Sequence, residues 1–191
     1  RPFSQDLFRK INCALASWWW GLCVSVTYFT GIKISIEGDE LPEEENALVI
    51  CNHQGMADIV VLLALAKAKR RVGNMKWFVK DIIKYFPGVG WGLSFLDTLF
   101  VKRTWHLDRE TIEATFAKIT KFKLPAWVIS FPEGSRITDV KHAIGVDYAK
   151  QAGFEPLKHH LAPRTKGFVA QVSALRGHLN VLYDVVIAYP D

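Results

Sequence analysis

A histidine and an aspartate, His53 and Asp58, lie between two apolar runs in the stretch VICNHQGMADIVVLLALA, residues 49–66. A neutral imidazole can take a proton from an alcohol near pH 7. A carboxylate on its other nitrogen fixes the tautomer and stabilises the imidazolium that forms. On a continuous helix, an offset of five residues turns two side chains away from each other. The pair can therefore meet only where the chain bends between a strand and a helix, which Gly55 allows.

The same two residues also fit a purely structural interpretation. Asp58 would then cap the following helix, and His53 would be a solvated loop residue. The spacing alone does not decide between the two. The corner nevertheless follows an interior strand, and the carboxyl ends of such strands are where open α/β sheets bind ligands.

A second polar corner follows the apolar run AWVISF in the stretch AWVISFPEGSRIT, residues 126–138. Its Arg136 offers a planar fork that suits a phosphate group. Ser135 lacks the glycine on its far side that a nucleophile elbow requires, so we do not expect a serine nucleophile. The alternative is a surface pair between Glu133 and Arg136, which would contribute little to stability.

Two basic clusters add candidate phosphate ligands. Lys102 and Arg103 close the strand-like stretch TLFVKR, and Lys166 opens a predicted helix after the basic loop HHLAPRT. The glycine-rich PGVGWG neither follows a predicted strand nor opens a predicted helix, so we reject it as a dinucleotide loop. We find no zinc-ligand spacing, and the basic residues lack the interleaved aromatics expected of a nucleic-acid binder.

The elements around these residues alternate between strand and helix patterns, which predicts an α/β fold with a mostly parallel or mixed central sheet flanked by helices. Strands are predicted at residues 32–38, 47–51, 75–79, 98–101, 126–131 and 181–189. Helices are predicted at residues 58–69, 107–121, 140–151 and 167–175, with a turn-rich segment at 86–92.

The N-terminal segment carries no charge between Lys10 and Lys33. About 20 apolar residues suffice to cross a bilayer, and the Trp18–Trp20 cluster is typical of a membrane interface. Interspersed polar residues leave three alternatives: a span, a helix lying in the interface, or a buried helix of a soluble protein. We expect residues 1–33 to form a membrane-associated helical segment and residues 34–191 a single catalytic domain, the whole being a segment of a longer protein.

Composition supports a lipid-related partner. Half of the 191 residues are apolar and the net charge is +5, which favours anionic partners such as lipid head groups, phosphates or CoA. The three cysteines (Cys13, Cys23 and Cys51) sit in apolar surroundings, so we expect buried thiols in a reducing compartment.

With these motifs in order, the chain resembles the glycerolipid acyltransferase superfamily, typified by 1-acylglycerol-3-phosphate acyltransferase. The four matching blocks are NHQGMAD, LFVKR, FPEGSR and VLYDVVIAYP. PRTKGF further resembles the branch that contains eukaryotic lysophosphatidate and lysocardiolipin acyltransferases. Three positions depart from the pattern: Gly55 replaces a common serine, Lys102 a common acidic residue, and Ser135 the usual threonine.

The resemblance implies that His53 deprotonates the free hydroxyl of a lysophospholipid, which attacks an acyl-CoA thioester, and that Asp58 orients His53. Further residues would hold the acceptor's phosphate or shape its pocket: Arg103, Glu133, Gly134, Ser135, Arg136 and Lys166. No metal or cofactor is implied beyond acyl-CoA as co-substrate. The expected location is a membrane, the endoplasmic reticulum in a eukaryote or the inner membrane in a bacterium. Two rivals remain: a CoA-independent transacylase and a catalytically silent lipid-binding protein.

Overall fold

A four-stranded sheet forms the centre of the computed structural model, which describes residues 4–87, 89–96, 98–102, 104–179 and 181–189. All pairings within this sheet are parallel, and its order is β2–β5–β1–β6. Its strands are β1 (Ala47–Cys51), β2 (Met75–Lys76), β5 (Trp127–Ser130) and β6 (Val181–Val185). A second parallel pair joins β3 (Phe78–Lys80) to β4 (Leu99–Val101). The predicted α/β class and its parallel sheet are confirmed.

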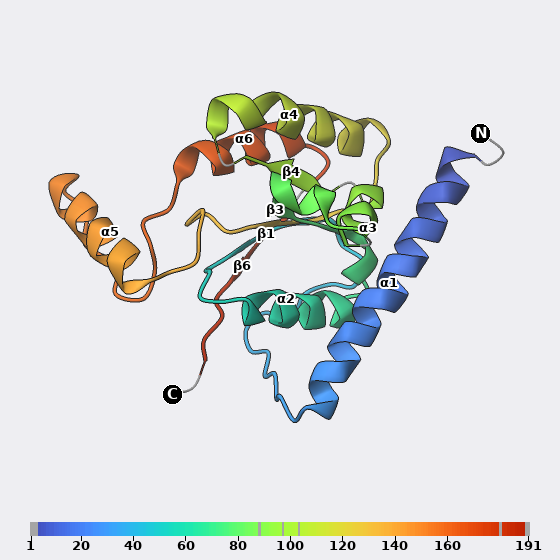
Figure 1. The fold of residues 1–191 in the computed structure, drawn as a ribbon, viewed down its shortest axis with the longest axis horizontal. Helices are drawn as coiled ribbons and strands as arrows, with labels where there is room; N and C mark the ends of the chain where they lie inside the picture. Colours follow the sequence, from blue (N-terminus) through green and yellow to red (C-terminus); the bar gives the residue numbers. More distant parts are fainter. Residues whose placement is uncertain (1–3, 88, 97, 103, 180, 190–191) are drawn as a thin grey trace.

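Helices cover both faces of this sheet, which explains why β1 and β5 are continuous apolar runs (Figure 1). On one face lie α2 (Ala57–Ala68), the 3₁₀ helix η1 (Val72–Asn74) and part of α1 (Gln5–Phe29). On the other face lie α4 (Trp105–Lys121) and α6 (Thr165–Leu175). The helical layers therefore bury the middle of each strand and leave the ends of the strands uncovered.

A fifth helix, α5 (Asp139–Gln151), projects away from these layers on the side of the sheet where α6 begins (Figure 1). Its position follows from the turn after β5, which leads the chain outward before residues 152–164 return it to α6. The predicted helices at 58–69, 107–121, 140–151 and 167–175 are each confirmed to within a few residues.

Four predicted elements were wrong in kind or length. The single strand predicted at residues 75–79 is two strands, β2 and β3, which belong to different sheets. Residues 32–38 form no strand, because no described strand runs beside them and most of their side chains are exposed. Part of the turn-rich segment is helical: α3 (Val89–Phe95) follows a second 3₁₀ helix, η2 (Asp81–Tyr85). It follows no strand, so a dinucleotide loop stays rejected. The last strand ends at Val185 instead of residue 189.

The predicted N-terminal helix is present as α1. Within the described residues, no helix combines the length and the hydropathy needed to cross a membrane. α1 packs closely on η1: a Cβ on Gly73 of η1 would lie 2.2 Å from the hydroxyl oxygen of Ser17 in α1. The Lys67 ammonium also donates to the Gly21 carbonyl at 3.2 Å.

Candidate active site

The two predicted corners and a third segment meet at the carboxyl ends of the strands. β1 lies between β5 and β6 with all three strands parallel, so their carboxyl ends point the same way. Residues 52–58 follow β1, residues 131–137 follow β5, and residues 186–189 follow β6. Parallel strand ends of this kind are the usual ligand sites of open α/β sheets.

The first corner brings His53 and Asp58 into contact. Nδ1 of His53 lies 2.7 Å from Oδ2 of Asp58, and the aspartate is 0% exposed. An ionised carboxylate only accepts hydrogen bonds, so Nδ1 carries the hydrogen and Nε2 is left as the basic ring nitrogen. The bend that the sequence required is present, because residues 52–55 are irregular and the helix begins at Ala57.

Asp58 also organises the loop that precedes it. The backbone N–H groups of Gln54 and Gly55 donate to Oδ2 at 2.7 and 2.9 Å. The Tyr189 hydroxyl donates to Oδ1 at 2.5 Å. Both N–H groups precede the helix, whose N-cap is Met56, so the simple capping interpretation of Asp58 was wrong. A buried carboxylate with four donors is instead held in one orientation.

The imidazole of His53 is fixed from the second corner. Its ring stacks on Phe131 with ring centres 4.1 Å apart and planes inclined by 20°. Its backbone carbonyl accepts from the Ile137 N–H at 2.9 Å, and its backbone N–H lies 3.4 Å from Oε1 of Glu133. The side chain of His53 keeps 14% of its surface exposed, so a substrate hydroxyl can reach it.

Glu133 and Gly134 line the same edge. Glu133 is 7% exposed; its Oε1 lies 3.7 Å from Nδ1 of His160, and its Oε2 has no hydrogen-bond partner among the described residues. Gly134 adopts a φ of +72°, and a Cβ there would lie 3.0 Å from Cδ of Arg164. A glycine is therefore required for two reasons: the left-handed backbone and the side chain that crosses it.

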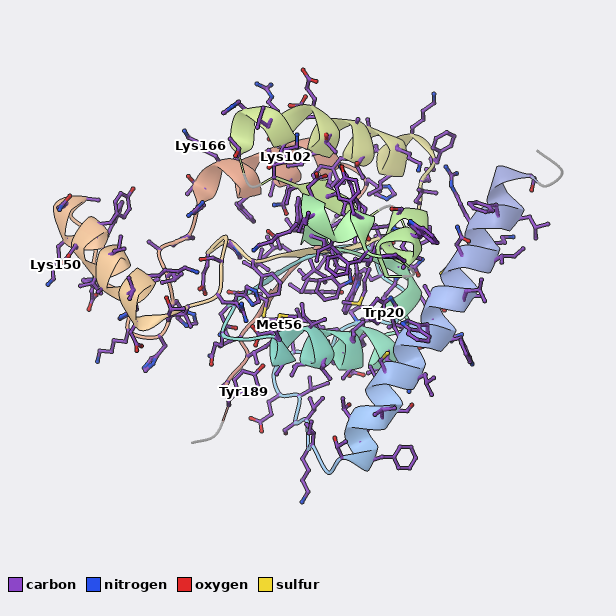
Figure 2. The ribbon with its side chains drawn as sticks, in the orientation of Figure 1. Trp20, Met56, Lys102, Lys150, Lys166 and Tyr189 are labelled. Carbon is purple, nitrogen blue, oxygen red and sulfur yellow. The ribbon has the colours of Figure 1, made fainter. Side chains whose placement is uncertain are left out.

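The predicted phosphate ligands are less tightly placed. Arg136 and Lys166 are exposed, and Ser135 is half-buried. In Figure 2, Lys102 and Lys166 lie beside α4 and α6, whereas Met56 and Tyr189 lie on the α2 side of the sheet. None of the hydrogen bonds found in the described ranges joins their charged groups to the dyad. Arg103 lies outside the described residues.

The buried thiol near the dyad is not a second nucleophile. Burial, with the nearby Asp58 and Glu133 charges, raises the pKa of Cys51 to about 12, so the thiol stays protonated. Cys13 and Cys23 are free but only half-buried, contrary to the prediction that all three are buried. Among the residues that the structure describes, no group of three or more His, Cys, Asp or Glu side chains could hold a metal ion.

Sequence reasoning missed several contact residues at this edge. Phe131 lies in the block FPEGSR, but an apolar side chain there carries no chemical signal of its own. The apolar pattern of residues 181–189 predicts Tyr189 to be a strand residue. Its contact with Asp58 joins positions 131 residues apart, which no local pattern reveals. The roles of His160 beside Glu133 and of Arg164 over Gly134 were likewise invisible, because a single sequence records no long-range contacts.

The comparisons with known proteins agree with this geometry. The family model named Acyltransferase matches residues 33–188. The 1-acyl-sn-glycerol-3-phosphate acyltransferase 2 of Brassica napus is 33% identical over 195 residues, 100% of this chain and 50% of the relative. The Homo sapiens 1-acyl-sn-glycerol-3-phosphate acyltransferase gamma is 32% identical over 193 residues, 98% of this chain and 51% of the relative. No solved structure matches the chain significantly.

The chain thus spans about half the length of the curated relatives that it matches. The family match begins before β1 and ends beyond β6, so it includes both corners and the strands that carry them. On this evidence, the chain belongs to the acyltransferase family.

Proposed function

We propose that the protein is an acyl-CoA-dependent O-acyltransferase that converts 1-acyl-glycerol-3-phosphate to phosphatidic acid. The names of its relatives support the reaction class and the lysophosphatidate acceptor. The observation that carries the proposal is the dyad, in which the buried Asp58 holds Nδ1 of His53 and leaves Nε2 as the basic nitrogen of a side chain that is 14% exposed.

In this mechanism, Nε2 of His53 removes the proton of the acceptor's free hydroxyl as that oxygen attacks the thioester carbonyl. The new C–O bond forms a tetrahedral intermediate, whose collapse breaks the C–S bond. The CoA thiolate leaves and takes the proton from the imidazolium. Asp58 stabilises that imidazolium while it exists, and no acyl-enzyme forms. General-base catalysis of this kind contributes about 10²–10⁴-fold to the rate.

The second corner would receive the acceptor's head group. Arg136 after β5 and Lys166 in the first turn of α6 supply positive charge. The N-terminus of α6, where the N-cap Arg164 makes no side-chain capping hydrogen bond within the described residues, adds backbone N–H groups. Glu133 adds a buried carboxylate whose Oε2 has no hydrogen-bond partner among the residues that the structure describes. Gly134 and Ser135 would shape the pocket, and Arg103 would add a further cation.

We also propose that α1 lies in the membrane interface with its outer face in contact with lipid. That face is a stripe of exposed apolar side chains spaced three or four residues apart: Phe8, Ile11, Leu15, Trp18, Leu22, Val26 and Phe29. Acyl chains leave a membrane reluctantly, since each buried CH₂ is worth about 0.8 kcal/mol. The endoplasmic reticulum or the bacterial inner membrane would supply the lipid, depending on the source.

The membrane proposal is tested with one pair of matched variants. Leu22→Glu places a charge on the α1 stripe, and Leu107→Glu places one on a similarly exposed leucine of α4. We expect Leu22→Glu to release the protein from liposomes of phosphatidylcholine and phosphatidylglycerol, and Leu107→Glu to leave binding unchanged. Equal flotation of both variants with the parent would contradict a lipid-facing α1.

The reaction is tested by product analysis. Purified protein is offered 1-acyl-glycerol-3-phosphate together with an isotopically labelled acyl-CoA or a labelled phospholipid, and the products are identified by mass spectrometry. We expect labelled phosphatidic acid from acyl-CoA alone. Product from the phospholipid in the absence of acyl-CoA would establish the transacylase instead, and no product from either donor would favour a silent lipid-binding protein.

A further inference from the structure

The segment after β6, residues 186–189, is bonded to the catalytic corner at three places. The side-chain amide of Asn52 exchanges two hydrogen bonds with the backbone of Ile187, at 2.9 and 2.7 Å. The side chain of Gln54 donates to the Ile187 carbonyl at 2.9 Å. The hydroxyl of Tyr189 donates to Oδ1 of Asp58 at 2.5 Å. The last described residues thus contact the loop that carries His53.

We propose that Tyr189 is a positioning residue of the dyad, which acts on His53 through Asp58. Its hydroxyl holds Oδ1 of Asp58, so that Oδ2 faces Nδ1 of His53. The same hydrogen bond withdraws negative charge from the carboxylate that the imidazole faces. This role rests on the proposed function only for its effect on catalysis. The coupling between Tyr189 and the protonation of His53 is a property of the structure itself.

The hydrogen-bond inventory of Asp58 explains why one hydroxyl matters. Three of its four donors converge on Oδ2, from His53, Gln54 and Gly55. Oδ1 receives only Tyr189 among the donors in the described part of the chain. Asp58 is fully buried, and an unsatisfied buried acceptor is costly. Without the tyrosine hydroxyl, the carboxylate is a more negative neighbour of the imidazole.

Tyr189 remains a donor throughout the working pH range. Burial, and after it the hydrogen bond to Asp58, raises the pKa of the phenol well above its ordinary value, so the hydroxyl stays protonated. A more negative Asp58 would favour the protonated imidazole, which cannot act as a base. The predicted sign is therefore fixed: removal of the hydroxyl moves the acidic limb of the activity profile to higher pH.

Other ionisable groups surround the dyad and must stay constant in the test. They are Glu133 after β5, His160 beside it, Cys51 at the end of β1 and Asp184 on β6. The structure offers a matched control that leaves all of them in place. Tyr183, in β6, donates its hydroxyl to a carboxylate oxygen of Glu45, which precedes β1. Among the described residues, no hydrogen bond or ion pair joins Glu45 to the dyad.

The test compares Tyr189→Phe with Tyr183→Phe, each of which removes one tyrosine–carboxylate hydrogen bond and keeps the ring. We expect Tyr189→Phe to lower kcat about ten- to a hundredfold, the range for a hydrogen bond to a charged group. We expect the acidic limb of its kcat/KM profile to move up by about half to one pH unit. Tyr183→Phe should lower the melting temperature without moving the profile.

A second readout does not depend on activity. The imidazole signals of His53, assigned by their loss in His53→Ala, are followed by NMR through a pH titration. Tyr189→Phe should raise the titration midpoint in the native chain, and it should add nothing in an Asp58→Asn background, where the negative charge is absent. An unmoved midpoint in Tyr189→Phe, or the same shift in Tyr183→Phe, would overturn the inference. A moved midpoint in a protein that transfers no acyl group would instead overturn only the proposed reaction.

Discussion

The corners after β1 and after β5 occupy neighbouring parallel strands, yet they differ in how their polar groups are satisfied. In the first corner, the carboxylate of Asp58 is fully buried and accepts from four donors. In the second corner, Glu133 is almost as buried, but its Oε2 has no partner in the described ranges, and the guanidinium of Arg136 is exposed.

This difference matches two roles, proton transfer and ligand binding. A proton-transfer pair gains from being fixed before the substrate arrives, because its geometry must match the transition state. A binding corner instead presents charged groups that a ligand can reach, as the exposed Arg136 does. We therefore interpret the first corner as the preorganised chemical half of the site and the second as the half that the acceptor completes.

The largest expected effect comes from removing the charge of Asp58 in the first corner. Asp58→Asn preserves size but favours the wrong imidazole tautomer, so we expect kcat to fall by up to about 10⁴-fold, by analogy with serine-protease triads. Steady-state kinetics and thermal melting on the same preparation measure this. A variant that is merely less stable and turns over at the parental rate would return Asp58 to a structural role.

An intermediate effect is expected at the second corner, which follows β5. Arg136→Ala removes a charge-assisted contact to phosphate, so the KM for the lysophosphatidate acceptor should rise about ten- to a hundredfold, and the KM for acyl-CoA should change little. The control is Arg70→Ala, which removes a surface arginine paired with Glu43 and Glu44 beyond the far end of α2. A rise confined to acyl-CoA would place Arg136 on the CoA phosphates instead.

The smallest effect concerns the glycine of the open corner. Gly134→Ala should lower the free energy of unfolding by about 1–2 kcal/mol, because its φ of +72° disfavours a side chain. Gly153→Ala is the matched control: its φ is +74°, and nothing lies within 4 Å of the added Cβ. Denaturant unfolding should give similar losses for both, whereas only Gly134→Ala should reduce activity, by displacing Arg164. Equal activity in the two variants would show that Arg164 does not contribute to the function of the site.

The sequence predicted the parts of this molecule whose signals are local. β1 and β5 are buried on both faces and therefore appear as continuous apolar runs, and the bend between His53 and Asp58 follows from their offset. The alternating stretch at residues 32–38 failed as a strand, because an alternating pattern does not supply a partner strand.

The missed features all depend on pairing between distant residues. The apolar residues 186–189 continue the pattern of β6, but β1 has already turned away, and the segment bonds Asn52, Gln54 and Asp58 instead. Nothing in the local pattern distinguishes a continuing strand from this arrangement. The division of the site into a satisfied and an open corner was invisible for the same reason.

The central claim is that His53, oriented by Asp58, is the general base of acyl transfer. It is tested most directly by the kcat/KM of His53→Ala with 1-acyl-glycerol-3-phosphate and acyl-CoA, measured beside its thermal unfolding. We predict a loss of about 10²–10⁴-fold in a variant that still unfolds cooperatively, since the imidazole packs mainly on Phe131. Activity within a factor of a few of the parent would remove His53 from the mechanism.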